Sequence, residues 1–332
     1  MNKFPQTFVP SSPIANPVIG RIRSSFFLCI ALVYGFVLSQ VPDVHFKDFN
    51  NYLRYADSSW LIALRFADGG LLRILSNEPL WLLMNAGLSL FLEPETVVRT
   101  IIFFGASSVA WFILRHYPQH FIWLILFLFL PQVIKNYLIH LRQGAAIAVF
   151  LWGWFAVNRS SHWLLMGLTP FIHSSFFLIL ALLALTWLLR TIRFAPDLKI
   201  ITYVAAGIAV GLGLGVLVEL FGARQASRYA FEGKDVSGLG FLLWVMILSV
   251  MLSAGKSWLR EHAFEIGIVT FYLVTYWLLE VTARIFESGL IVVLLAGLTL
   301  RGWRRQVFLG MVLGAGALDW VLRIGRPALG FA

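Results

Sequence analysis

The chain has 332 residues, of which 59% are hydrophobic and 13% charged, and its mean hydropathy is +0.82. An ordinary soluble domain carries about 25% charged residues and does not repeat apolar runs of about 20 residues, so this composition excludes one. The net charge is +10, yet no soluble basic segment remains to bind nucleic acid. We therefore expect an all-α, polytopic bundle of about 11 transmembrane spans. The single cysteine, Cys29, excludes a disulfide framework.

The first 23 residues are polar and include Lys3, Arg21 and Arg23 but no acid. They predict a cytoplasmic tail before a retained first span, because no clear signal-peptide cleavage site follows Phe26–Leu38. Residues 24–332 are then expected to form one membrane-embedded domain. Its further apolar runs lie at 97–114, 120–134, 138–157, 162–173, 175–190, 199–220, 238–255, 263–281, 286–301 and 306–322.

The apolar run at 79–92 decides the orientation of everything after it. If this run crossed the membrane, the basic clusters at 190–199 and 301–305 would lie outside, against the positive-inside rule. A re-entrant or interfacial segment at 79–92 places those clusters in the cytoplasm. We expect this second arrangement, in which the polar loops 42–78 and 222–237 are both outside.

The outer loop 42–78 predicts a helix that lies on the membrane surface. Asp48 stands at an N-cap position, and the apolar residues after it recur at helical spacing. In one interpretation, Asp48 and Arg54 are solvated charges on a capped helix. In the other, the Asp48 carboxylate holds the acceptor hydroxyl of a substrate or takes the proton of that hydroxyl. Glu78 precedes Pro79, an arrangement typical of a helix start, and it is also a candidate site residue.

The most informative segment is the head of the run at 138–157. Arg142 and Gln143 enter the apolar region, and Gly144 behind them would let another helix approach closely. Lys135 is seven residues before Arg142, so we expect the two cations to share one helix face. Ionisable groups at membrane depth indicate function, although an arginine at a helix end can also snorkel to the interface.

His173 follows a break at Thr169 and Pro170, in a turn between two shortened helices. Histidine titrates near neutrality, which suits a general base, whereas a histidine among aromatic residues is often a packing residue. Both interpretations stay open at this point.

Two further polar patterns are expected on the outer face. Arg224 and Arg228 are four residues apart, which would give a fork for an anion on one helix face, with Tyr229 next to it. Tyr272, Tyr276, Glu280 and Arg284 recur every four residues and predict a polar stripe that faces the protein interior. A solvated arginine pair and a simple Glu280–Arg284 ion pair are the alternatives.

The polar groups with no structural explanation thus gather on one face, and arginine is in surplus among them. They suit an anionic ligand at the bilayer surface, and a lipid-linked pyrophosphate meets that description.

Several short motifs occur in a recognisable order. Asp48 precedes Tyr52, Glu78-Pro79-Leu80 follows, and then come LRQGAAIA at 141–148, His-Ser-Ser at 173–175 and Ser-Arg-Tyr at 227–229. This order resembles the EpsG family of bacterial exopolysaccharide proteins, relatives of Wzy-type polymerases. The resemblance implies a polymerase in the bacterial inner membrane that joins polyprenyl-pyrophosphate-linked oligosaccharide units by glycosyl transfer at the outer face. It implies no cofactor and no metal, and its partners would be membrane lipid and a chain-length regulator or flippase.

Under this resemblance, His173 is the expected base, Asp48 holds the acceptor, and Arg142 stabilises the leaving pyrophosphate. The expected substrate-binding residues are Gln143, Lys135, Arg224, Arg228, Tyr229, Arg54, Glu78, Tyr276, Glu280 and Arg284. Two alternatives remain. One is a glycosyltransferase that uses polyprenyl-phosphate sugars, with Asp48 as base or metal ligand, and the other is a flippase or exporter of the lipid-linked oligosaccharide.

Overall fold

A computed structural model of the chain describes residues 17–41, 48–220, 238–326 and 330. All the secondary structure in these residues is helical, which confirms the all-α prediction. The helices in chain order are α1 (Pro17–Ser39), α2 (Phe49–Ala67), α3 (Leu71–Ser76), α4 (Pro79–Leu88), α5 (Pro94–His116), η2 (Pro118–His120), α6 (Phe121–Leu128), α7 (Pro131–Leu138), α8 (Leu141–Trp154), α9 (Arg159–Leu168), η3 (Thr169–Phe171), α10 (Ser175–Thr191), α11 (Pro196–Leu220), α12 (Leu239–Leu252), α13 (Lys256–Glu261), α14 (Ala263–Thr275), α15 (Thr282–Leu298) and α16 (Trp303–Arg323).

Four segments in the described residues are long and apolar enough to cross a membrane: Ile22–Ser39, Pro94–His116, Pro196–Gly213 and Trp303–Arg323. A fifth candidate is the pair Pro118–Leu128 and Pro131–Leu138, which is bent by 69°. The expected number of about 11 spans is therefore not confirmed. Several of the apolar runs form helices of 10–17 residues, and at 1.5 Å per residue these fall short of a hydrocarbon core of about 30 Å.

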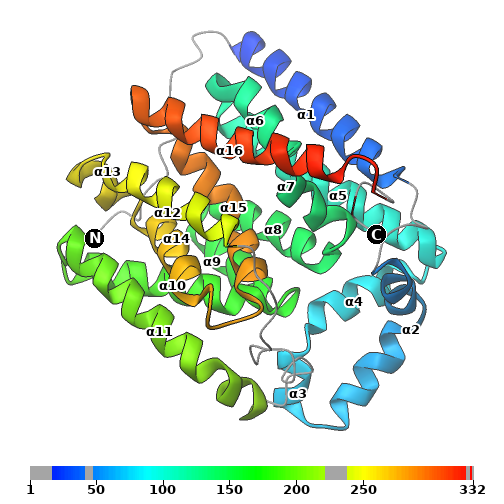
Figure 1. Ribbon diagram of the computed structural model, residues 1–332. Helices are drawn as coiled ribbons and strands as arrows, with labels where there is room; N and C mark the ends of the chain where they lie inside the picture. The colour runs from blue at the N-terminus through cyan, green and yellow to red at the C-terminus, as the bar shows by residue number, and fades with distance from the viewer. Residues whose placement is uncertain (1–16, 42–47, 221–237, 327–329, 331–332) are drawn as a thin grey trace.

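The centre of the molecule is occupied by α15, with α16 lying across it (Figure 1). Almost every residue of α15 is buried, including Glu287 and Ser288. Helix α14 is similarly enclosed. An apolar sequence is thus explained here by burial against protein, which a hydropathy plot cannot distinguish from burial in lipid.

The segment before the bundle core follows the sequence prediction. Helix α2 forms where a helix was expected, with Tyr52 and Ala56 buried while Trp60 is 62% exposed. Ser89 at the end of α4 donates a hydrogen bond to the carbonyl oxygen of Ala56, which fixes α4 against α2. With 10 residues, about 15 Å of helix, α4 by itself is too short to span the hydrocarbon core of a membrane.

The chain breaks between α7 and α8, at Ile139 and His140. The prediction that Lys135 and Arg142 share one helix face is therefore wrong, because the two residues belong to different helices. The physical reason lies 87 residues upstream. The hydroxyl of Tyr52 donates to the carbonyl oxygen of Ile139 (2.8 Å) and accepts from the backbone N–H of Leu141 (3.1 Å), so it satisfies backbone groups that a continuous helix would pair.

Gly144 allows the two halves of this break to pack together. A Cβ atom at this position would lie 2.3 Å from the carbonyl oxygen of Asn136 and 2.9 Å from the ring of Tyr137. The sequence-based expectation of a close helix approach at Gly144 is thus confirmed.

Candidate active site

Glu78 is the centre of a buried polar cluster. It is 5% exposed and has a left-handed backbone conformation, with φ at 58°. Although it stands at the N-cap of α4, its side chain makes no capping hydrogen bond. The carboxylate instead contacts Nη1 of Arg142, Nδ1 of His173 at 2.8 Å and the backbone N–H of Ser174 at 3.1 Å.

Three helix beginnings converge on this carboxylate. Glu78 precedes α4, Arg142 lies in the first turn of α8, and His173 and Ser174 precede α10. The amino-terminal end of a helix favours negative charge, because its first N–H groups have no partner within the helix. Burial raises the pKa of Glu78, but the Arg142 charge and the His173 hydrogen bond lower it, to about 2 overall. Glu78 is therefore anionic at neutral pH.

The contact with Glu78 sets the orientation of the His173 ring. A carboxylate can only accept a hydrogen bond, so Nδ1 carries the proton in this contact. In neutral histidine the other nitrogen, Nε2, is then an acceptor, and it has no partner among the described residues. The His173 side chain is 12% exposed. A carboxylate that orients an imidazole in this way leaves the second nitrogen able to take a proton.

Helix α2 supports Arg142 from the other side. The guanidinium lies 5.5 Å from the ring centroid of Tyr55, a cation–π distance. Tyr52 and Tyr55 pack edge-on against the fully buried Trp81, with ring centroids 5.9 and 6.1 Å apart. Helix α2 therefore fixes the head of α8, and with it Arg142.

A second ion pair lies next to this cluster. Lys135 on α7 donates to Oε1 of Glu287, which is 6% exposed, while Oε2 of Glu287 is buried without a partner. His140 lies between α7 and α8, outside the candidate spans. Burial lowers its pKa, and the charges of Lys135 and Arg284 lower it further, to about 3. His140 is thus neutral, and it lies among several cations.

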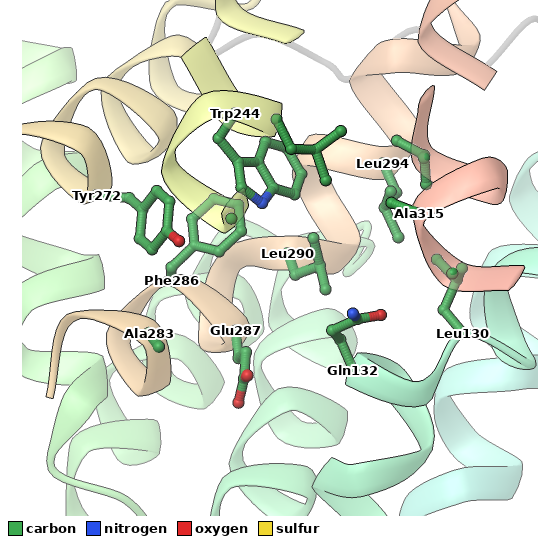
Figure 2. A pocket seen from close by; sticks show the side chains of 14 residues that line it. Leu130, Gln132, Trp244, Tyr272, Ala283, Phe286, Glu287, Leu290, Leu294 and Ala315 are labelled. Carbon is green, nitrogen blue, oxygen red and sulfur yellow. The ribbon is translucent and has the colours of Figure 1, made fainter. Parts of the chain in front are cut away.

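A cavity of about 180 Å³ lies beside the Lys135–Glu287 pair, between α7, α12, α14, α15 and α16. Figure 2 shows the rings of Trp244, Tyr272 and Phe286 together at one side of it, with Leu290 and Gln132 nearby. Most of its lining is apolar, so the space suits a hydrocarbon group.

The predicted polar stripe does not form on a single helix. Helix α14 ends at Thr275, so Tyr272 and Tyr276 are separated from Arg284 by a turn that contains Glu280. The hydroxyl of Thr282 donates to the carbonyl oxygen of Thr275 at 2.8 Å and closes this turn. The prediction of one continuous stripe is therefore wrong, because a local hydrogen bond ends the helix that the spacing assumed.

The remaining predicted residues lie around the cluster or away from it. Asp48 stands at the N-cap of α2 as expected, but it makes no side-chain capping bond and accepts one from Asn51 at 3.3 Å. Gln143 is buried and donates to the carbonyl oxygen of Arg284 at 2.8 Å. Arg54, Glu280 and Arg284 are exposed.

Tyr276 is partly buried and packs against Phe241, with ring centroids 5.3 Å apart. Among the described residues the Arg284 guanidinium has no ion pair or hydrogen bond, so it is free to meet an anion. Arg224, Arg228 and Tyr229 lie outside the described residues. The part of the chain that is described contains no group of three His, Cys, Asp or Glu side chains suited to a metal ion.

Sequence reasoning did not single out Glu287 or His140. An acid at the start of the apolar run 286–301 is a usable sequence signal, since a carboxylate in such a run needs a cation partner. The sequence singled out Lys135 but not its partner Glu287, because the two residues are 152 positions apart in the chain.

Comparison with known proteins identifies the family. The model of the EpsG family matches residues 21–315. No curated protein and no solved structure matches the chain. The match covers most of the chain, and it includes the α2, α4, α8 and α10 segments that form the buried cluster. The protein therefore belongs to the EpsG family, as the order of its motifs predicted.

Proposed function

We propose that the protein is a Wzy-like polysaccharide polymerase of the bacterial inner membrane. It transfers a growing glycan from polyprenyl pyrophosphate to the hydroxyl of another lipid-linked oligosaccharide, at the outer face. The observation that carries the proposal is the His173–Glu78–Arg142 cluster, a base oriented by a buried carboxylate beside an arginine, in a member of the EpsG family.

In the proposed step the acceptor oxygen forms a bond to the anomeric carbon, and the bond from that carbon to the pyrophosphate oxygen breaks. Nε2 of His173 takes the proton of the acceptor hydroxyl, while Glu78 holds Nδ1–H and stabilises the imidazolium that forms. The pyrophosphate leaves with the electron pair of the broken bond.

The leaving pyrophosphate is anionic, and we propose that two arginines, Arg284 and Arg142, bind it. Arg284 is exposed and unpaired within the described residues, and Arg142 has donors beyond the one that contacts Glu78. Guanidinium groups bind phosphate oxygens through two parallel hydrogen bonds. Lys135 is proposed to donate to the same phosphate oxygens with the N–H groups that its contact with Glu287 leaves free. The adjacent apolar cavity suits part of the lipid chain.

The test is elongation by purified protein in nanodiscs. Supplied with polyprenyl-pyrophosphate-linked oligosaccharide, the protein should make products longer by whole repeat units and release polyprenyl pyrophosphate. Arg142→Lys keeps the charge but loses the two-pronged geometry, so it should lose most of this activity. Arg99→Lys is the matched control, since Arg99 is also a partly buried arginine that pairs with a carboxylate, Glu95, but it lies outside the cluster.

Other products would contradict the proposal in identifiable ways. Extension by one sugar with release of polyprenyl phosphate would indicate a single-sugar transferase. Movement of the lipid-linked oligosaccharide between leaflets without a longer product would indicate a flippase.

A further inference from the structure

A cluster of cations, separate from the Glu78 cluster, lies where the end of α10 and the short helix α13 meet the start of α11. It consists of Arg190, Lys199 and Arg260, which we call the basic site. Nη2 of Arg190 donates to the carbonyl oxygens of Arg260 (3.1 Å) and Glu261 (2.6 Å). The charges of Arg190 and Arg260 both act on Lys199. The basic site is at the opposite end of α10 from His173, about 25 Å along the helix.

No ion pair in the described residues involves the basic site. The buried Glu265, nearby on α14, lies 3.7 Å from Nδ1 of His262 instead. Lys199 is 5% exposed, yet it has no hydrogen bond or ion pair of its side chain among the described residues. Nε of Arg190 is buried without an acceptor. The neighbouring acids Asp197 and Glu261 form no ion pair with these cations in the described part of the chain.

A buried ammonium without a partner is costly, and three cations close together repel one another. The partner that would relieve both penalties is an anion. Lysine and arginine donors around one point suit a phosphate group.

The surroundings indicate which kind of phosphate. Large apolar side chains on α10, on α11 and in the turn between them are exposed next to the basic site: Trp187, Leu188, Ile192, Phe194, Leu198 and Ile201. Helix α11 contains a candidate span that begins at Pro196, so the cations lie at its edge. An exposed apolar surface that ends in a cationic cluster matches a lipid, with its chains beside the helices and its headgroup at their ends.

We propose that Arg190, Lys199 and Arg260 bind the phosphate of an anionic phospholipid, whose acyl chains lie along the exposed apolar side chains of α10 and α11. This site is separate from the active-site cluster and takes no part in the proposed transfer. Figure 1 shows α10, α11 and α13 together at one side of the molecule. The sequence predicts that the basic segment at 190–199 is cytoplasmic, where membrane surfaces carry anionic lipid.

The decisive variant is Lys199→Met, which keeps an unbranched chain and removes the charge. Thermal unfolding midpoints are measured in nanodiscs of phosphatidylcholine, with and without phosphatidylglycerol. Phosphatidylglycerol should raise the midpoint of the wild type. In phosphatidylcholine alone Lys199→Met should unfold at a higher temperature than the wild type, because repulsion is removed, and it should gain little from phosphatidylglycerol.

Two further variants keep the test independent of folding. Arg260→Gln changes an exposed residue and should lose at least half of the phosphatidylglycerol effect. Lys256→Met, on the same short helix but outside the basic site, should keep the full effect. If phosphatidylglycerol raises the unfolding midpoints of Arg260→Gln and Lys256→Met by the same amount, the proposal is wrong.

Native mass spectrometry and inorganic phosphate distinguish a lipid from a free anion. The wild type should retain at least one phosphatidylglycerol molecule that Arg260→Gln loses. If inorganic phosphate in phosphatidylcholine nanodiscs stabilises the wild type as much as phosphatidylglycerol does, the site takes a free anion and the lipid assignment is wrong. These measurements do not involve glycan transfer, so their outcome is independent of the proposed polymerase activity.

Discussion

Glu78 lies between two side chains that the chain supplies from 64 and 95 residues further on, Arg142 and His173. A buried carboxylate is stable only when its charge is compensated and its oxygens accept hydrogen bonds. Here both oxygens do so, and the backbone N–H of Ser174 adds a third contact. A single side chain thus joins the beginnings of α4, α8 and α10.

Glu78→Gln tests this role, because it keeps the shape and removes the charge. Arg142 would lose its counter-ion, and breaking a buried pair costs about 3 kcal/mol or more of unfolding free energy. Elongation should fall about 100-fold or more, because the His173 ring loses its orienting carboxylate. Thermal unfolding and initial elongation rates measure the two effects.

Glu95→Gln is the control, since Glu95 pairs with Arg99 but its side chain is 60% exposed. An exposed pair contributes about 0–1 kcal/mol, so this variant should behave like the wild type. If Glu78→Gln and Glu95→Gln elongate at equal rates, Glu78 has no part in the reaction.

His140 gives the protein a stability that depends on pH. Its pKa is lowered from 6.5 to about 3 by burial and by the neighbouring Lys135 and Arg284 charges. Between these values the unfolded chain binds a proton that the folded chain does not, so the contribution is complete above pH 6.5 and is lost as the pH falls towards 3. The slope is at most about 1.4 kcal/mol per pH unit.

His140→Asn should therefore lose less stability than the wild type between pH 6.5 and pH 4. The unfolding midpoint in detergent, measured across this range, compares the two proteins. Parallel curves for the wild type and the variant would show that His140 does not cause the acid sensitivity.

At the scale of the helices, the close packing of α7 on α8 depends on Gly144. A Cβ atom there would press on the backbone of Asn136, and backbone cannot move aside as a flexible side chain can. Gly144→Ala should lower the free energy of unfolding by about 1–3 kcal/mol. In Gly310→Ala, where the added Cβ meets nothing within 4 Å, stability should rise by up to about 1 kcal/mol. Equal midpoints for the two variants would contradict this account of the helix contact.

The sequence predicts a helix where apolar periodicity and the position of proline determine its start and end. The start of α4 at Pro79 and the turn that holds His173 both follow from local rules. The break between α7 and α8 does not, because it depends on the distant hydroxyl of Tyr52. For the same reason Glu78, Arg142 and His173 could be singled out as candidates from the sequence, but the contacts between them could not be predicted. Glu287, the partner of Lys135, was not singled out.

At the scale of the whole molecule, burial in protein replaces burial in lipid for several apolar segments. Helix α15 is apolar because other helices surround it, and a sequence plot reads it as a span. The described residues contain four candidate spans, or five with the bent α6–α7 pair. The orientation of the bundle is nevertheless testable, because the Glu78 cluster and the basic site lie at opposite ends of α10.

Cysteine labelling in a Cys29→Ser background addresses that orientation. Arg54→Cys lies on the exposed side of α2 and should react with an impermeant reagent added to intact cells. Arg193→Cys, next to the basic site, should react only after the membrane is opened. Labelling of Arg193→Cys from outside would contradict the re-entrant arrangement of residues 79–92.

The most direct test of the proposed active site is the elongation rate of purified wild type and His173→Ala from pH 5 to pH 8, with donor binding measured in parallel. We expect His173→Ala to elongate far more slowly than the wild type at every pH in this range and still to bind the lipid-linked donor. His120→Ala, a partly buried histidine outside the cluster, should keep the wild-type profile. Wild-type rates for His173→Ala across this range, together with an inactive Asp48→Asn, would contradict the account and assign the base to Asp48.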